Sequence, residues 1–167
     1  KNKVDDLKKM GFTKPSSLGI VSNMKGLTIN QNSLKILAKK YSLRFVILHG
    51  SAARNTMHKD SDIDIAVVGD KPLSFKDQIK LFGDFEKAIH SKIPRDFDIK
   101  TLEKADPLFL NEVVSDGVLL YGNALDFEEL KSYAFRAYMD SYDLRELELA
   151  LAKKYQKHLN SLVSQMH

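Results

Sequence analysis

The chain has 167 residues, of which 43% are hydrophobic and 29% charged, a composition that is typical of one ordinary globular domain and argues against a disordered protein. Because it contains no cysteine, disulfides and cysteine-ligated zinc are excluded, and any metal must be held by oxygen or imidazole. The net charge of +4 suits a phosphate-bearing ligand but is too small and scattered to predict nucleic-acid binding.

The first part of the chain carries few signals of regular structure. Residues 1–27 are rich in lysine and interrupted by glycine and proline, so we predict an N-terminal arm there. A helix is predicted over 29–41, because Thr28 and Gln31 have the spacing of a capping box and apolar residues then recur on one helical face.

Two predicted strands follow, with a turn between them. The apolar run at 45–48 predicts a strand buried on both faces. Gly50 and Ser51 come directly after it and indicate a sharp turn into a short helix over 51–57. Residues 62–68 predict the second strand, which ends at a glycine.

The next predicted elements are a helix and a third strand. Ser74 has the spacing of a helix cap, and the helix over 75–91 is predicted to turn four apolar side chains inward. These four are Phe75, Ile79, Phe82 and Ile89. Residues 95–100 alternate polar and apolar side chains, which predicts a strand with Phe97 and Ile99 on its core face.

The C-terminal third is predicted to be mainly helical, with a helix over 106–115 and a short edge strand over 118–121. From Asp126, which has capping spacing to Glu129, the pattern predicts one long helix, or two helices broken near Ser141. An apolar stripe on this segment fits either docking on another chain or a helical cap on the sheet. The stripe consists of Leu144, Leu147, Leu151, Tyr155 and Leu162.

Together these elements predict an α+β fold built on one mixed sheet. We divide it into the arm at 1–27, a core at 28–122 and a helical extension at 123–167. No apolar run is long enough to span a bilayer, and the lysine-rich start lacks the apolar stretch of a secretory signal. We therefore expect a cytoplasmic protein that makes no membrane contact.

Two pairs of aspartates are the first candidates for chemistry. Asp62 and Asp64 are two residues apart on one predicted strand, so their carboxylates point to the same face. Asp96 and Asp98 share a face of the third strand in the same way. If the two strands are neighbours, these carboxylates can hold hard divalent cations such as Mg²⁺, which suits two-metal phosphoryl or nucleotidyl transfer.

The turn after the first buried strand is a candidate anion site. Gly50 lets the backbone approach a ligand closely, and the Ser51 hydroxyl is a further donor to phosphate. Ten residues separate Ser51 from Asp62, so a short crossover connects this turn to the predicted metal site.

The string HGSAARNTMHKDSDIDIAVV, at 49–68, resembles the G-S-x10-D-x-D signature of the DNA polymerase β-type nucleotidyltransferases. It is most similar to that of the minimal nucleotidyltransferases, which are the antitoxin halves of pairs with HEPN-domain toxins. The resemblance covers roughly residues 30–122, and it implies a core of four or five strands flanked by helices. The later strings DFDIKTL and ADPL resemble the strand of the third aspartate and the segment that follows it. In that register Asp98 is the third acid, with Asp96 as the alternative.

The resemblance also implies a site and a reaction. Gly50 and Ser51 are expected to bind the phosphates of a nucleoside triphosphate, and Asp62, Asp64 and Asp98 to hold two Mg²⁺ ions. A hydroxyl then attacks the α-phosphate in line and pyrophosphate leaves, with Asp98 placed to accept the hydroxyl proton. The family expectation for the nucleotide is ATP.

Several neighbouring residues keep alternative interpretations. Arg54 can steady the phosphates or form an ion pair with a neighbour. Lys100 shares the face of Asp98, and we favour a counter-ion role for it over contact with substrate. His49 is interpreted as a packing residue. Asn55 stands where the family commonly has glycine, but asparagine also tolerates left-handed backbone.

The leading hypothesis is therefore a Mg²⁺-dependent adenylyltransferase that places AMP on a HEPN RNase toxin, on a tyrosine hydroxyl, and thereby acts as an antitoxin. One alternative is a nucleotidyltransferase for a small molecule such as an aminoglycoside. Another is an antitoxin without catalysis that blocks its partner by contact. Pairing of chains through the C-terminal helix is also open, whereas direct nucleic-acid binding is not expected because no helix-turn-helix or RNA-binding signature is present.

Overall fold

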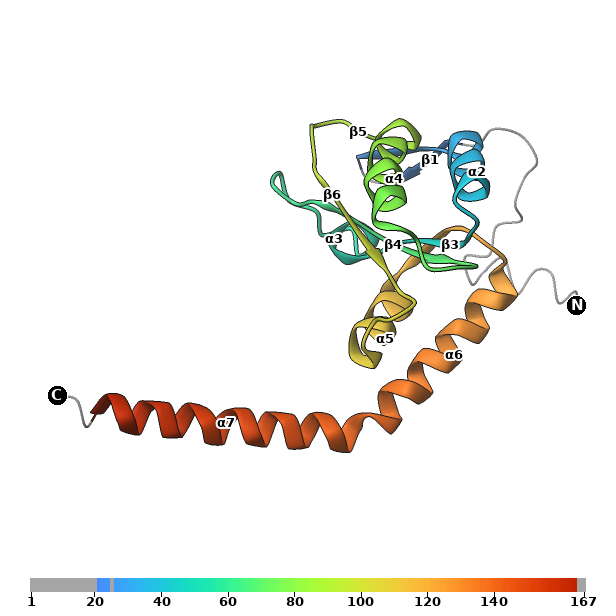
Figure 1. Cartoon of the computed structure of the whole chain (residues 1–167). Coiled ribbons are helices and arrows are strands. Elements are labelled where there is room, and N and C mark those ends of the chain that lie inside the picture. Colours follow the sequence, from blue (N-terminus) through green and yellow to red (C-terminus); the bar gives the residue numbers. More distant parts are fainter. Residues whose placement is uncertain (1–20, 25, 165–167) are drawn as a thin grey trace, which may run out of the picture.

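The computed structural model describes residues 21–24 and 26–164. The described elements, in chain order, are β1 (Val21–Met24), β2 (Leu27–Asn30), α2 (Gln31–Lys40), β3 (Leu43–Leu48), α3 (Gly50–Ala53), β4 (Ile63–Gly69), α4 (Phe75–Ala88), β5 (Ile89–Ser91), β6 (Phe97–Thr101), α5 (Pro107–Asp116), β7 (Val118–Tyr121), α6 (Ala124–Asp140) and α7 (Tyr142–Ser164). Figure 1 shows how they are arranged.

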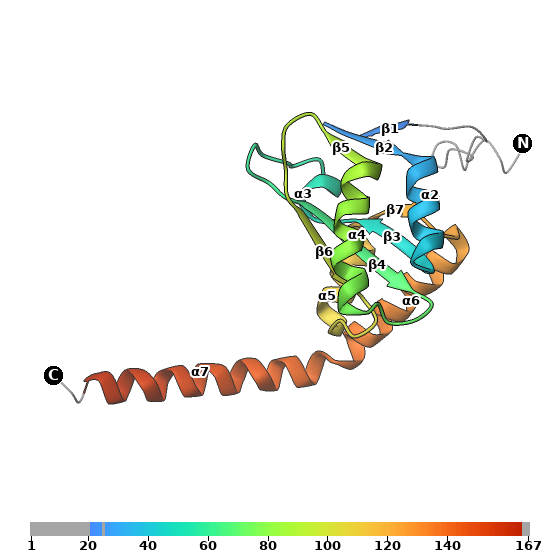
Figure 2. The same ribbon diagram turned by 45° about the horizontal axis from the view of Figure 1, so that its top comes forward.

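The centre of the fold is a four-stranded mixed sheet in the order β6-β4-β3-β7. The strand β4 runs parallel to β6 and antiparallel to β3, and β7 is antiparallel to β3. Helices α2 and α4 cover one face of the sheet, and α5 and α6 cover the other (Figures 1 and 2). The predicted α+β fold with one central mixed sheet is thus present.

A small second sheet, in the order β1-β2-β5, forms where the N-terminal arm was predicted to end. The rest of that arm, residues 1–20, lies outside the described residues. Thr28 belongs to β2 and does not cap the following helix, so the predicted capping box is wrong. The cap is Asn30, whose Oδ1 accepts a hydrogen bond of 3.1 Å from the backbone N–H of Ser33.

The inward face of α4 differs from the prediction. Ser74 caps the helix as expected, but Phe75 is 77% exposed, and Ile79 and Phe82 are also exposed. The buried row is Leu81, Phe85 and Ala88, and Ile89 is buried as part of β5. Both rows have helical spacing, so periodicity alone could not distinguish them.

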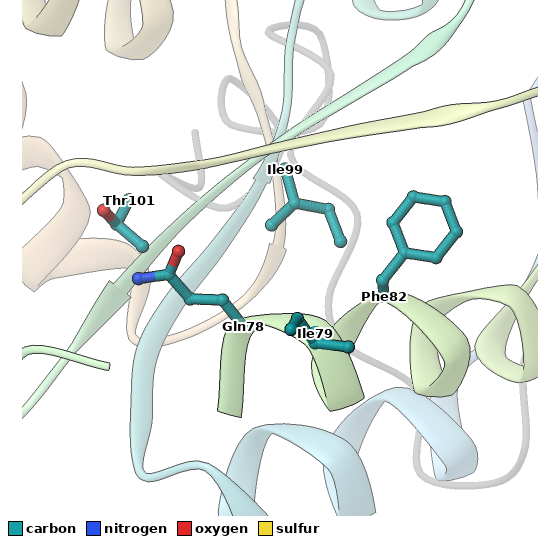
Figure 3. Close-up of a pocket in the computed structure, with 5 residues that line it drawn as sticks. All are labelled: Gln78, Ile79, Phe82, Ile99 and Thr101. Atoms are coloured by element: carbon teal, nitrogen blue, oxygen red, sulfur yellow. The ribbon is translucent and has the colours of Figure 1, made fainter. Parts of the chain in front are cut away.

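The exposed apolar row of α4 lies beside the edge strand β6. A cavity of about 450 Å³ opens between the two elements (Figure 3). Its lining consists of Gln78, Ile79, Phe82, Ile99 and Thr101. This row is therefore only partly covered by the sheet.

Of the two alternatives for the C-terminal segment, the structure shows two helices broken at Ser141, because α6 ends at Asp140 and α7 begins at Tyr142. Asn123 caps α6 by accepting hydrogen bonds from the backbone N–H groups of the next turn, so the predicted cap at Asp126 is wrong. Helix α6 packs into the core, whereas α7 runs away from it (Figure 1). The prediction of a helical cap on the sheet is therefore wrong for the apolar stripe of α7, in which Leu144, Leu147 and Leu151 are exposed.

Among the described helices, none combines the length and the apolar character needed to cross a membrane.

Candidate active site

Asp64 and Asp98 are register partners in the parallel pair of β4 and β6. The isoleucines on either side of Asp64 pack in the core beneath α2 and α4. Because side chains alternate along a strand, the Asp64 carboxylate points to the opposite face, on the side of α5. The apolar neighbours of Asp98 pack in the same way, so both carboxylates lie side by side on one face of the sheet.

The turn that follows β3 lies directly against Asp64. Gly50 has a φ of +64°, in the left-handed region that favours glycine. A Cβ atom at this position would lie 2.8 Å from Cγ of Asp64 and still closer to Oδ2. The backbone N–H of His49 also donates a 3.0 Å hydrogen bond to the carbonyl oxygen of Asp64. The predicted anion site and the predicted metal site are thus adjacent in space.

The rest of this turn differs from the sequence expectation in the length of its helix and agrees with it at Asn55. The helix α3 has four residues and is shorter than the predicted 51–57. Ser51 is half-buried in it. Asn55 follows with a φ of +57°, so it does adopt the left-handed conformation that the family pattern requires at this position.

Asp62 and Asp96 lie in the loops that lead into β4 and β6. Both are exposed and both line a cavity of about 650 Å³. The carbonyl oxygen of Asp96 accepts a 2.9 Å hydrogen bond from the N–H of Ile63, which extends the pairing of the two strands. The structure thus brings Asp64 and Asp98 together directly and leaves Asp62 and Asp96 at the open end of the strand pair.

Partial burial raises the pKa of the Asp64 carboxyl, and the negative charges of Asp98 and Asp62 raise the pKa further, against the opposing effect of His49. Hard oxygen donors with this mutual repulsion suit a divalent cation, which would relieve it. Within 21–24 and 26–164, no three acidic or histidine side chains are already arranged to hold a metal ion. In the chemistry of its oxygen donors the site nevertheless fits Mg²⁺, with Asp64 and Asp98 side by side and Asp62 at the open end of the strand pair.

The two basic candidates form ion pairs. Lys100 Nζ lies 3.0 Å from Oδ1 of Asp98, which agrees with the favoured counter-ion role. Arg54 pairs at 3.5 Å with Asp116, at the end of α5. Both basic side chains are about half exposed.

His49 lies closer to Asp64 and Asp98 than the predicted packing role implied. Its ring packs edge-on against Phe109 of α5, with 5.9 Å between ring centroids, so the predicted packing role is correct. Its Nε2 is buried without a hydrogen-bond partner among the described residues. Burial lowers the pKa of His49, while the carboxylates of Asp64 and Asp98 oppose that shift. The signal for this placement was its position directly before Gly50.

Residues 31–126, more than half of the chain, match the family model described as polymerase beta nucleotidyltransferase. The chain belongs to this nucleotidyltransferase family, and the predicted family and enzyme class are confirmed. Within it, the chain is similar to the protein adenylyltransferase MntA of Shewanella oneidensis. The two are 31% identical over 102 residues, which make up 60% of this chain and 70% of MntA.

Solved structures give the same fold. One match is a chain in the crystal structure of a toxin-antitoxin with AMP-PNP, with a TM-score of 0.62 and 24% identity over 75% of this chain and 99% of that chain. Another is a chain in the structure of the tri-AMPylated Shewanella oneidensis HEPN toxin in complex with MNT antitoxin. It has a TM-score of 0.57 and 22% identity over 74% of this chain and 95% of that chain. The predicted fold class is therefore confirmed.

Proposed function

We propose that this chain transfers AMP from ATP to a tyrosine hydroxyl of a HEPN toxin, and thereby acts as an antitoxin in the cytoplasm. The observation that carries this proposal is the register of Asp64 with Asp98, together with the Gly50 turn against the Asp64 carboxylate. The similarity to an adenylyltransferase and to a chain from a complex with an AMPylated toxin supports the choice of nucleotide and acceptor.

The binding of ATP is assigned to the turn after β3. Gly50 and Ser51 hold the phosphates, because the missing Cβ of Gly50 lets an anion approach the backbone next to the acidic site. Arg54 is exposed enough to leave Asp116 and contact the same phosphates. The positive side chain of Arg54 would compensate part of the triphosphate charge.

The acidic residues organise the reaction. Asp62, Asp64 and Asp98 are assigned to two Mg²⁺ ions, which would neutralise the triphosphate and polarise the reacting phosphate. The tyrosine oxygen forms a bond to the α-phosphorus while the bond from that phosphorus to the bridging oxygen breaks, and pyrophosphate leaves with the electron pair. Asp98 accepts the proton of the hydroxyl. Lys100, at 3.0 Å, balances the charge of Asp98.

The test uses ATP that is labelled on its α-phosphate, together with Mg²⁺ and a HEPN protein encoded by the gene next to that of this chain. It measures transfer of the label to the HEPN protein. We expect the label on the HEPN protein, and we expect Asp64→Asn to reduce the transfer rate by roughly 10²-fold or more. Asp70→Asn is the matched control, because Asp70 is an exposed aspartate just beyond the other end of β4. An unlabelled HEPN partner would contradict the proposal.

A second candidate function is neutralisation of the toxin by contact alone, which the exposed apolar stripe of α7 favours. The Asp64→Asn variant distinguishes the two, because it keeps the surface of the protein and loses the chemistry. Rescue of cells from the toxin by this variant would favour contact. Loss of rescue together with retained binding would favour AMP transfer.

A further inference from the structure

Helix α7 extends away from both hydrophobic cores (Figures 1 and 2). It has 23 residues, a length of roughly 34 Å at ~1.5 Å per residue. Over 142–161, every residue except the half-buried Arg145 is exposed. An apolar stripe on such a helix needs a partner to be buried, because an isolated helix gains its stability mainly from packing.

The stripe is narrow and continuous. With about 100° of rotation per residue, Leu144, Leu147, Leu151 and Tyr155 fall within a sector of about 80°. Leu151 stands in the middle of this set and is 55% exposed. Leu149 is equally exposed, at 54%, but lies on the opposite face of the helix. Only one side of α7 is therefore suited to a partner.

The stripe is complementary to itself when two copies run in opposite directions. In an antiparallel pair centred on Leu151, residues that lie equally far from Leu151 on either side face each other. Leu151 then meets Leu151 of the second copy, and Leu147 meets Tyr155. This is the contact pattern that a two-fold axis requires.

The charged residues along one edge of the apolar stripe, here called its flank, favour the same antiparallel arrangement. Asp143 and Glu146 occupy the first half of this flank, and Lys154 and Lys157 the second half. None of these four side chains has an opposite charge three or four residues away, and none forms an ion pair within the described residues. An antiparallel two-fold pair places the acids of one copy beside the lysines of the other, whereas a parallel two-fold pair places this flank on opposite sides of the two helices, where its acids and lysines do not meet.

We propose that α7 is a dimerisation helix, which packs antiparallel against α7 of a second copy of this chain about a two-fold axis near Leu151. Leu147, Leu151 and Tyr155 form the centre of the buried seam of this pair, and Leu144 of each copy faces His158 of the other. The acidic and basic halves of the flank fix its direction. The two nucleotidyltransferase cores then lie at opposite ends of the helix pair.

The oligomeric state tests the seam. We expect sedimentation of the full chain to show a dimer that dissociates on dilution, and Leu151→Glu to give a monomer whose nucleotidyltransferase core remains folded. Leu149→Glu is the matched control, with the same residue type, substitution and exposure, and should remain a dimer. A monomeric parent chain, or a dimer that survives Leu151→Glu, would overturn the proposal. A monomer that binds a HEPN protein through Leu151 would also overturn it in favour of that partner.

Charge reversal tests the flank. Lys154→Glu combined with Lys157→Glu should weaken the dimer at low salt, because acids then face acids. Adding Asp143→Lys and Glu146→Lys to the same chain should restore it. Dimer strength that does not respond to the first pair of changes would exclude the antiparallel charge pairing.

Disulfide crosslinking tests the direction, and the absence of natural cysteine gives a clean background. Leu151→Cys should crosslink to itself. Leu144→Cys should not, because its two copies would be roughly 21 Å apart along the axis at ~1.5 Å per residue, far beyond disulfide reach. A mixture of Leu147→Cys and Tyr155→Cys should crosslink to each other. Efficient self-crosslinking of Leu144→Cys would indicate a parallel pair and overturn the proposal.

Discussion

The backbone of Gly50 fits against the carboxylate of Asp64 so closely that no other residue can replace the glycine without moving the acid. The same glycine has a left-handed backbone, with φ at +64°. Two independent requirements therefore fall on one position, one from the conformation of the turn and one from the space beside the acid.

Gly50→Ala should lower the free energy of unfolding by about 1–2 kcal/mol through its left-handed backbone, and should also abolish nucleotidyl transfer by displacing Asp64. Urea unfolding and the transfer assay measure the two effects. Gly26→Ala is the control, because Gly26 also has a positive φ, +87°, but nothing lies within 4 Å of the added Cβ. Gly26→Ala should lower the free energy of unfolding and leave the transfer activity unchanged. Full activity of Gly50→Ala would show that the close approach has no role in the reaction.

Asp98→Asn and Asp96→Asn should behave differently. Asp98 is the register partner of Asp64, and the proposed function assigns it the proton of the acceptor hydroxyl, so its loss should lower the transfer rate by roughly 10²–10⁴-fold. Asp96 lies in the loop before β6, and its replacement should leave most of the activity. The reverse order of effects in the same assay would identify Asp96 as the third acid.

The carboxylate of Asp84 on α4 should make stability depend on pH. It accepts hydrogen bonds from Lys40 Nζ at 2.6 Å and from the Tyr41 hydroxyl at 2.9 Å, and these bonds lower the pKa of Asp84. A lowered pKa means that the contribution is complete above the unfolded-state value of about 3.9 and disappears as the pH falls through the folded-state pKa. Asp84→Asn should therefore lower the urea midpoint at pH 7 but hardly at all in strong acid. An equal loss at both pH values would argue against the ionic contribution.

Two phenylalanines of α4 test which face of the helix is buried. Phe85 is fully buried, so Phe85→Ala should cost about 3–5 kcal/mol through lost transfer energy and the cavity it leaves. Phe75 is mostly exposed at the start of the same helix, and Phe75→Ala should change stability by less than about 0.5 kcal/mol. Denaturant unfolding of both variants measures their free energies of unfolding. Similar losses of stability in the two variants would contradict the observed packing.

The sequence allowed the local parts of the site to be predicted, because their signals are short-range. The apolar run of β3, the glycine turn and the two aspartates spaced two residues apart at the start of β4 each depend on a few adjacent residues. The ion pair of Lys100 with Asp98 was also foreseeable, since both share one face of a strand.

What could not be predicted depends on tertiary contacts. Helix α4 has two apolar rows with the same spacing, and only packing against the sheet decides that Phe85 is buried and Phe75 exposed. Asn30 and Asn123 cap their helices where capping-box patterns at Thr28 and Asp126 competed with them. The direction of α7 depends on the break at Ser141, whose angle no periodicity encodes.

The strand β6, which carries Asp98, lies at the edge of the central sheet, where β4 is its one neighbour among the described strands. Edge strands fray before central ones, because half of their backbone groups lack a partner in the sheet. A brief local opening at this edge would separate the two acids while the remainder of the domain stays folded. We therefore expect mild heating to abolish the transfer activity reversibly, at temperatures where circular dichroism still shows the native secondary structure.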